Sequence, residues 1–279
     1  MAKKSTAHET GELPGSGEDV PLAPAVIAFG PDPFAGLDLA MGLQKLLDAL
    51  PAAVPGFAAA RLRLAAYAGH RPAARALEAA GLESDAGPSD PDKWCAGLGT
   101  FGSLPRLRAA YAVATQVLPS WETAFPDDPS PRVALTAVAG WFDALRPATR
   151  RRSVVGTLDP WLALPEGSVV VACLEAARDA EEAAARAMER WRTGDGAVFA
   201  AAHAGAAAAR VARFAAGSGP PALLGEAFAF AAISFLRDDG AGESRAAIAN
   251  SQSKAARRRC LPFAKQGVLE LALAPLHSG

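Results

Sequence analysis

Apolar residues recur along most of this chain at spacings of three and four, which is the pattern of amphipathic helices. The first such segment starts at Phe34, and the sequence PAAVPG ends it, because proline and glycine interrupt helices. Its predicted apolar face consists of Leu37, Met41, Leu43, Leu47 and Leu50. The segments FAAARLRLAAYAG and HRPAARALEAAG follow as a predicted helical hairpin, with Pro72 in a first turn and Gly81 closing the second helix.

A polar stretch, ESDAGPSDPDKW, separates this hairpin from a longer helical pattern, SLPRLRAAYAVATQVLPSWETAF, and is expected to be a long loop. Because Pro119 lacks an N–H group, we expect it to kink this longer helix or to split it at Leu118. The next helix contains RVALTAVAGWFDAL. We expect Ser130 to cap its N-terminus and Pro131 to occupy its first position.

The second half of the chain is dominated by two alanine-rich segments, SVVVACLEAARDAEEAAARAMERW and GAVFAAAHAGAAAARVARFAA, which are predicted to be long helices. In the first, Arg186 follows Glu182 by four positions and precedes Glu189 by three, which is typical of a solvated helix face. SVVVACL is the one candidate strand, but it runs into helical sequence without a break. An apolar segment and one or two C-terminal helices follow, punctuated by GSGPP and RDDGAGES.

These patterns predict an all-α fold, an alanine-rich bundle of stacked helix hairpins over 34–279, with a disordered N-terminal tail over 1–33. Within the helical domain, a hairpin over 34–82, a central region over 94–217 and C-terminal helices over 218–279 can be distinguished. Alanine supplies about a quarter of the chain, and its high helix propensity favours the same fold. LRLAAYAGH and LEAAG resemble an ankyrin repeat, but two arginines replace the usual proline and histidine and no second repeat follows.

Charge and hydropathy argue against nucleic acid and membranes as partners. The formal net charge is -1, and acidic and basic residues are interspersed. The longest strongly apolar run, ALLGEAFAFAAISFL, is interrupted by Glu226 and is too short to span a bilayer of about 30 Å. Two arginine runs, 150–152 and 257–259, lack interleaved aromatic residues, and we interpret them as a solvated loop or as charge near a helix C-terminus.

Cysteine usage and the first residues of the chain favour a cytoplasmic protein. Cys95, Cys173 and Cys260 are odd in number and far apart, so we expect small buried side chains in a reducing compartment and no disulfides. The sequence MAKKSTAHETGELPGSGEDVPLAP contains lysines but lacks the apolar core of a secretory signal.

No metal site, cofactor site or catalytic constellation is predicted. The histidines, His8, His70, His203 and His277, do not have the His or Cys spacing of a zinc site. The local motifs of phosphate binding, dinucleotide binding and serine hydrolysis are also missing. His203 stands in the middle of an alanine-rich helix. We interpret it as a half-buried side chain hydrogen-bonded to a neighbour, in preference to a proton-transfer or ligand role.

The strongest concentration of charged side chains lies in VLPSWETAFPDDPSPRVALTAVAGWF, where Glu122, Asp127, Asp128 and Arg132 fall within a dozen residues. Adjacent aspartates generally point in different directions, and no histidine or reactive hydroxyl flanks them, so a paired acid and base is not expected. Their expected role is to satisfy free N–H groups at the start of the next helix, while Arg132 reaches back to an acid. The residues alone therefore favour a rigid capped turn over an active site.

This stretch resembles an alpha-helical immunity protein family of bacterial toxin systems. The resemblance is carried by Val117, Leu118, Pro119, Trp121 and Glu122, then by Pro126, Asp127, Asp128, Pro131 and Arg132, and finally by Trp141. The two alanine-rich helices that follow are similar to paired helices of the family, and His203 matches a histidine often present in the second of them. The likeness covers residues 94–217, and the connection over 146–166 is longer than in the family.

The resemblance implies a protein that binds another protein, namely a toxin, with no cofactor and no catalysis. The residues it implies for partner binding are Glu122, Asp127, Asp128, Arg132 and His203. Two alternatives stay open. One is a structural or scaffold protein in a larger assembly, and the other is an enzyme whose site is assembled from distant residues, including His203 and the charged residues of the turn.

Overall fold

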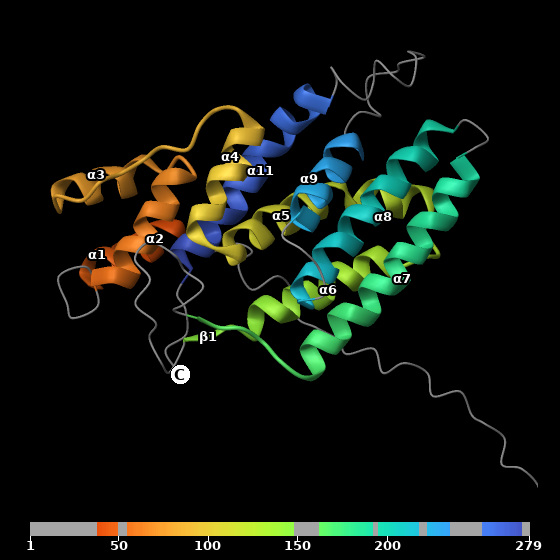
Figure 1. The fold of residues 1–279 in the computed structure, drawn as a ribbon, viewed down its shortest axis with the longest axis horizontal. Coiled ribbons are helices and arrows are strands. Elements are labelled where there is room, and N and C mark those ends of the chain that lie inside the picture. Colours follow the sequence, from red (N-terminus) through yellow and green to blue (C-terminus); the bar gives the residue numbers. More distant parts are fainter. Residues whose placement is uncertain are drawn as a thin grey trace, which may run out of the picture.

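A computed structural model describes residues 38–49, 55–147, 162–191, 195–217, 222–234 and 253–274. These residues are helical almost throughout, which confirms the all-α prediction (Figure 1). The described part contains one pair of two-residue strands, β1 (Arg146–Pro147) and β2 (Leu162–Ala163), which run antiparallel. The candidate strand SVVVACL lies in helix α7 (Ser168–Trp191). The predicted N-terminal tail lies outside the described residues.

The first three helices are α1 (Leu39–Ala49), α2 (Pro55–Tyr67) and α3 (Arg71–Ala79). As predicted, Pro72 stands in the first turn of α3, and Gly81 follows this helix with a φ of 70°, which favours glycine. The prediction for Met41 was wrong, because its side chain is 52% exposed. Gly42 and Leu46 face the interior of the protein instead. At Gly42 a Cβ would collide with the carbonyl oxygen of Leu273, so only glycine permits this approach. Leu37 and Leu50 lie outside the described residues.

The polar stretch that was expected to be a loop, residues 83–94, is non-helical as far as residue 90, as predicted, but its last four residues begin helix α4 (Pro91–Gly97), which the 3-10 helix η1 (Leu98–Phe101) follows. The carboxylate of Asp90 caps α4 by accepting hydrogen bonds from two backbone N–H groups, each at 3.1 Å. Trp94 is fully buried, and its Nε1 donates to the carbonyl oxygen of Tyr67 at 3.3 Å. This buried tryptophan ties the short helix to α2.

Helix α5 (Ser103–Ala124) continues through Pro119, so of the two predicted alternatives, a kink and a split at Leu118, the split was wrong. Proline inside a helix removes one backbone hydrogen bond, at a cost of about 3 kcal/mol. Packing on the opposite face offsets this cost. Leu118 and Trp121 are both buried, whereas Pro119 itself is exposed.

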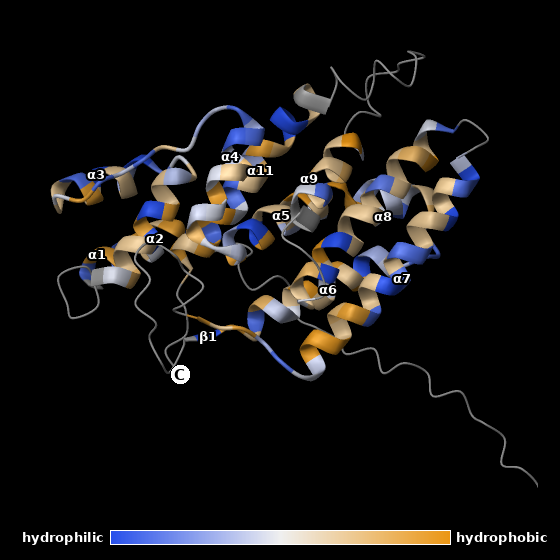
Figure 2. Ribbon diagram, viewed as in Figure 1, coloured by the Kyte–Doolittle hydropathy of each residue, from blue (hydrophilic) through white to orange (hydrophobic). Residues whose placement is uncertain are grey.

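Helices α6 (Ser130–Asp143), α7, α8 (Gly196–Ala215) and α9 (Ala222–Ser234) complete the larger part of the fold. Figure 1 shows α7 and α8 side by side, and α8 packs against α5, α6, α7 and α9. Apolar residues occupy most of α8 (Figure 2), and most of its alanines are buried. Small side chains allow a helix to be surrounded closely by several others, which explains its central place.

Helix α11 (Ser253–Leu273) passes between the first four helices and the α5–α9 part (Figure 1) and packs against α2, α5 and α9. Two buried arginines hold it in place. Arg61 of α2 donates from Nε to the carbonyl oxygen of Ala272 at 2.7 Å, and burial lowers its pKa to about 10. Arg108 of α5 donates to a carboxylate oxygen of Glu270 at 2.6 Å.

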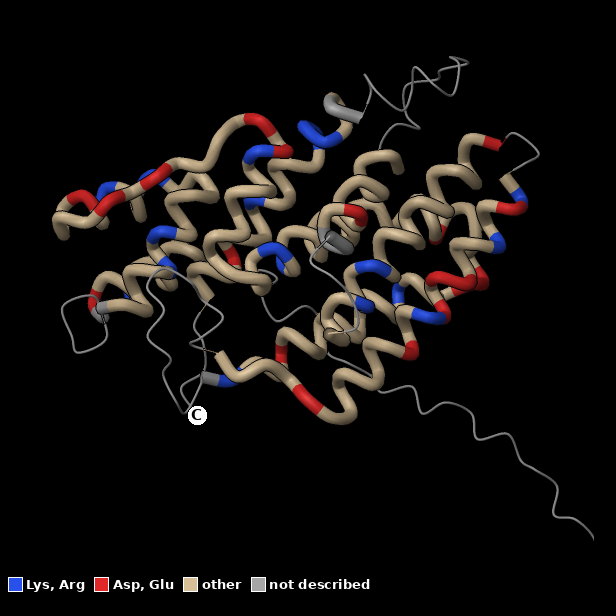
Figure 3. Tube along the Cα trace, in the orientation of Figure 1, with Lys and Arg blue, Asp and Glu red and all other residues tan. Residues whose placement is uncertain are grey.

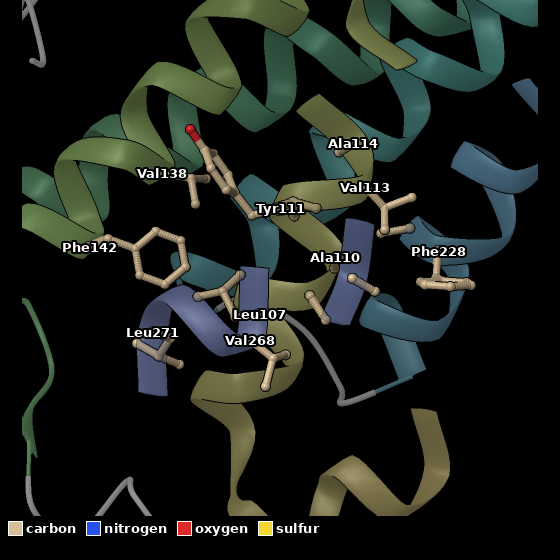
Figure 4. Close-up of a cluster of buried hydrophobic side chains, with 14 of the residues drawn as sticks. Leu107, Ala110, Tyr111, Val113, Ala114, Val138, Phe142, Phe228, Val268 and Leu271 are labelled. Atoms are coloured by element: carbon tan, nitrogen blue, oxygen red, sulfur yellow. The ribbon is translucent and has the colours of Figure 1, made fainter. Parts of the chain in front are cut away.

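One cluster of buried residues extends from Leu46 to Ala274. Figure 4 shows part of it, with side chains contributed by α5, α6, α9 and α11. The edge of the Tyr111 ring meets Phe142, with the ring centroids 5.5 Å apart. The chain therefore joins its first and last described helices through a shared interior. None of the described helices is both long and apolar enough to cross a membrane.

The arginine run 257–259 lies in the first turns of α11, and not in a loop or near a helix C-terminus as expected. Arg257 forms an ion pair with Asp92 of α4, so this arginine lies on the side of α11 that faces α4. The other arginine run, 150–152, lies outside the described residues.

Candidate functional site

The candidate site is built on the turn between α5 and α6, where the sequence concentrates its charged residues. Trp121, in the last turns of α5, is 1% exposed and anchors this turn. Its Nε1 donates a hydrogen bond to the backbone carbonyl of Asp128 at 2.7 Å. Its ring lies 4.7 Å from that of Phe125, centroid to centroid. The turn is therefore pinned to the helix that precedes it.

Asp128 holds the start of α6. Its Oδ1 accepts hydrogen bonds from the backbone N–H of Ser130 at 3.0 Å and from the Ser130 hydroxyl at 2.6 Å. The prediction that Ser130 caps the helix was wrong, since its hydroxyl donates to the carboxylate and α6 begins at Ser130 itself, after Pro129. A carboxylate is the stronger acceptor, which explains why Asp128 takes this role. The prediction that an aspartate satisfies free N–H groups here is confirmed.

Two further charged side chains brace the outside of the turn. Arg132, in the first turn of α6, forms an ion pair with Glu122 of α5, so the prediction that this arginine reaches back to an acid is confirmed. Arg132 is 62% exposed, and exposed ion pairs contribute less than about 1 kcal/mol to stability. Asp127 is exposed at the tip of the turn and makes no ion pair or hydrogen bond with any other residue of the described ranges.

A pocket of about 380 Å³ opens between this turn and helix α7, and we call it the turn pocket. Its lining consists of Trp121, Ala124, Phe125, Pro126, Asp127, Asp128, Ala183, Arg186, Ala187 and Arg190. The guanidinium of Arg190 lies over the ring of Phe125, 5.6 Å from its centroid. The pocket thus combines an aromatic wall with carboxylates from the turn and guanidinium groups from α7.

Arg186 links the pocket to the outer face of α7. Its Nη1 donates to Glu182 at 2.7 Å, as the spacing of these residues predicted, and its Nη2 lies 3.8 Å from an oxygen of Asp128. This second distance is too long for a hydrogen bond but short enough for charge attraction. Along α7 acidic and basic residues are intermixed (Figure 3). A partner would therefore meet a surface of mixed charge.

His203 does not join the turn residues. It lies on α8, is 7% exposed, and its Nδ1 donates to the carbonyl oxygen of Phe199 at 2.8 Å, so that nitrogen carries the proton. Its ring contacts those of Phe199 and Phe230, with centroid distances of 4.2 and 5.8 Å. Burial lowers its pKa, because charging the ring there loses solvation. The predicted hydrogen bond to a neighbour is confirmed, but the side chain is buried and not half-buried as predicted.

Other reactive groups lie away from the turn pocket. Cys173 and Cys260 are buried, Cys95 is partly buried, and none of the three forms a disulfide. Burial raises the pKa of the Cys173 and Cys260 thiols to about 12 and that of Cys95 to about 11. Thiols with such values hold little thiolate at neutral pH and are poor nucleophiles. Within the described ranges, no three His, Cys, Asp or Glu side chains converge as a metal site would require.

Comparison of the chain with family models, curated proteins and solved structures found no match. The structure brings Glu122, Asp128 and Arg132 to one turn, leaves Asp127 exposed beside them, and places His203 elsewhere. Sequence reasoning missed the two arginines of α7 that complete the pocket. Their spacing of four residues, which puts both on one helix face, was the only available signal.

Proposed function

We propose that this protein is a non-enzymatic protein-binding module that contacts its partner at the turn pocket. The observation that carries this proposal is the pocket itself, an open recess of about 380 Å³ with an aromatic wall and charged groups of both signs. Side chains of these kinds, when held in a recess at the surface, are those that contribute most to protein–protein binding.

Rigid positioning supports a binding role. The hydrogen bond from Trp121 to the turn, the Asp128–Ser130 bonds and the Glu122–Arg132 pair fix the backbone around the pocket before any partner arrives. A surface that is already ordered loses little conformational entropy on binding. Asp127 is the carboxylate of this pocket with no role in holding the turn, which leaves it available to a partner.

The turn pocket accounts for only part of an interface. A stable complex buries about 800 Å² on each partner, which is more than a recess of this size supplies. The exposed side of α7 borders the pocket and carries Glu182 and Glu189 beside the two pocket arginines. We expect the partner to fill the pocket with one or two side chains and to extend along this helix.

We further propose that the partner is a bacterial toxin, which the protein neutralises by covering its surface. The support for this step is the resemblance of the turn sequence to alpha-helical immunity proteins. It includes Glu122, Asp127, Asp128 and Arg132, which lie at or beside the pocket. His203 is also implied by the resemblance, but only a small part of its side chain is accessible. A cytoplasmic location and the exclusion of nucleic acid stay predictions from the sequence.

Affinity capture from the native host tests the proposal when wild-type protein is compared with Asp127→Arg. We expect one protein to be captured by the wild type and lost from the variant, with thermal unfolding unchanged. Asp143→Arg is the matched control, because Asp143 is exposed on α6 away from the pocket and the substitution changes the charge equally. The captured protein is then expressed in cells, where the wild-type chain should restore growth and Asp127→Arg should not.

Three outcomes would contradict the proposal. Equal capture by wild type, Asp127→Arg and Asp143→Arg would place the interface elsewhere. A metabolite that copurifies with the protein and is converted on incubation would favour an enzyme instead. A discrete large oligomer of the purified chain, with no second protein captured, would favour a scaffold.

A further inference from the structure

Two of the three cysteines, Cys95 of α4 and Cys260 of α11, lie in helices that pack against each other. Figure 1 shows these helices side by side, and Cα atoms of one come within 8 Å of Cα atoms of the other. Both cysteines are free thiols in this structure. They are far apart in the sequence, so only the tertiary fold brings them to the same interface.

The ion pair between Asp92 and Arg257 fixes the register of these two helices. From this pair both helices run in the same direction, because α4 leads into α5, whose Arg108 bonds to Glu270 farther along α11. Each cysteine stands three residues after its own helix's member of the pair, which is nearly one helical turn and the same side of the helix. The two thiols are therefore placed opposite each other across the interface.

The electrostatics of the two thiols agree with this placement. Burial is the main cause of their raised pKa values, but the charge of Cys95 adds to the increase in the pKa of Cys260, and Arg257 lowers the pKa of both. Charges act in this way on near neighbours. Cys173 of α7 differs, because burial alone raises its pKa.

We propose that Cys95 and Cys260 form a reversible disulfide that joins α4 to α11 when the chain meets a disulfide oxidant such as oxidised glutathione. Cys95 reacts first, because it is partly exposed whereas Cys260 is fully buried. Its thiolate attacks one sulfur of the oxidant and releases one glutathione thiolate. The Cys260 thiolate then attacks Cys95 Sγ and releases the second, so that two electrons and two protons pass from the chain to the oxidant.

Burial makes this bond slow to form and slow to reduce. Thiols with raised pKa values hold little thiolate at neutral pH, so brief oxidation leaves the pair reduced. The same thiols are poor leaving groups, so a reducing thiol displaces them slowly once the bond exists. The pair thus responds to sustained oxidation by fastening α4, a helix of 7 residues, to the last described helix. This proposal does not depend on the turn pocket or on its partner.

The test treats the folded full chain with oxidised glutathione, blocks the remaining thiols and identifies linked peptides by mass spectrometry. We expect one disulfide within the chain, between Cys95 and Cys260, with Cys173 still a thiol and the chain lighter by the mass of two hydrogens. The oxidised protein should unfold at a higher temperature than the reduced one, because the crosslink restricts the unfolded chain. Reduction with dithiothreitol should restore the original midpoint.

Alanine variants distinguish a cysteine pair from separately reactive thiols, and alanine avoids burying an unpaired hydroxyl. In Cys260→Ala, the remaining Cys95 should stop at the mixed disulfide with glutathione, whereas Cys95→Ala should not react. Cys173→Ala is the matched control, since it removes a cysteine as buried as Cys260 and should form the bond at the wild-type rate. Thermal unfolding under reducing conditions is recorded for each variant.

Two kinds of result would overturn the proposal. Wild-type protein that accumulates the mixed disulfide at Cys95 without forming the second bond would show that the two thiols do not meet. A bond that involves Cys173 would contradict the pairing. So would three free thiols after a treatment that oxidises the same chain when it is unfolded in urea.

Discussion

Trp121 of α5 and Trp141 of α6 are both buried, but their indole groups are used in opposite ways. Trp121 is buried beside the charged turn pocket and donates its hydrogen bond to the backbone at 2.7 Å. Trp141 is buried beside an uncharged recess of about 450 Å³ near the start of α5, and among the described residues its indole nitrogen has no partner. The Trp121 indole N–H thus stabilises the turn that it contacts, whereas the Trp141 indole N–H contributes no hydrogen bond among the described residues.

The contrast shows where this fold permits recesses. Elsewhere the helices approach closely, and even behind the turn pocket a Cβ at Gly205 of α8 would lie 3.0 Å from the Trp121 ring and 3.3 Å from the Cβ of Ala184. Such close packing of small residues leaves no room for a ligand. Recesses form at the helix ends, and the side chains located there decide whether a recess is charged or apolar.

The largest expected effect distinguishes the two tryptophans directly. Trp121→Phe removes buried volume and leaves the Asp128 carbonyl without its donor, so we expect a loss of about 2 to 3 kcal/mol in the free energy of unfolding. Trp141→Phe removes a similar volume but a donor that has no partner among the described residues, so we expect its loss to be smaller by about 1 kcal/mol, the contribution of one hydrogen bond. Urea unfolding of both variants measures the difference. Equal losses would show that the two indoles are bonded alike.

The second largest loss of stability is expected for Asp128→Ala. It removes the acceptor for the Ser130 N–H and should lower the free energy of unfolding by about 0.5 to 2 kcal/mol, the usual cost of a lost helix cap. Asp128→Asn keeps an oxygen acceptor and should recover most of that stability. Thermal unfolding at one pH and salt concentration measures both variants. A loss in Asp128→Asn as large as in Asp128→Ala would mean that charge, and not the hydrogen bond, holds the turn.

Much of the helical framework could be predicted from the sequence because its signals are local. The proline in the first turn of α3 and the glycine after it act through their own backbones, and Glu182 and Arg186 meet because they share one helix face. The charged turn could be recognised for the same reason. Each of its residues lies within about a dozen positions of the others along the chain.

The errors arose where distant packing decided the outcome. Pro119 is tolerated in α5 because Leu118 and Trp121 beside it are buried against other helices. Helix α4 has 7 residues, too few to be stable alone, and it depends on Trp94 reaching the Tyr67 carbonyl. The Trp141 indole, which has no hydrogen-bond partner among the described residues, has no sequence signal, since a missing partner becomes visible only in three dimensions.

The pH dependence of stability gives a smaller effect, which arises at the buried His203 of α8. Because burial lowers the pKa of His203, the unfolded chain takes up the proton more readily than the folded chain. The stability from neutral His203 is fully present above the unfolded pKa of about 6.5 and is lost as pH falls toward the folded value. The difference between wild type and His203→Gln in free energy of unfolding should therefore decrease from pH 7.5 to 5.5.

His70 provides the control, because burial also lowers its pKa although it lies in the α2–α3 connection, far from the turn pocket in the chain. His70→Gln should remove its own share of the pH dependence and leave that of His203 unchanged. An identical pH profile for wild type and His203→Gln would show that this histidine titrates as it does in the unfolded chain.

The smallest expected effect belongs to the outer face of α7. Arg186 and Glu182 form an exposed pair one helical turn apart, and such pairs contribute about 0.3 to 0.5 kcal/mol. Glu182→Gln should change stability by no more than that, and the change should diminish in 1 M salt. Urea unfolding at low and high salt measures it. A loss above 1 kcal/mol would mean that the pair is part of the structure of the pocket.

The most direct test of the partner site compares affinity with stability in one variant, Asp127→Ala, using the protein that the wild-type chain captures. Asp127 forms no hydrogen bond or ion pair with another described residue, so thermal unfolding of the variant should match that of the wild type. Its affinity for the captured protein, measured by calorimetry, should fall more than about tenfold, or 1.4 kcal/mol. Asp143→Ala should change neither. An Asp127→Ala protein that is stable and binds its partner with wild-type affinity would contradict the account.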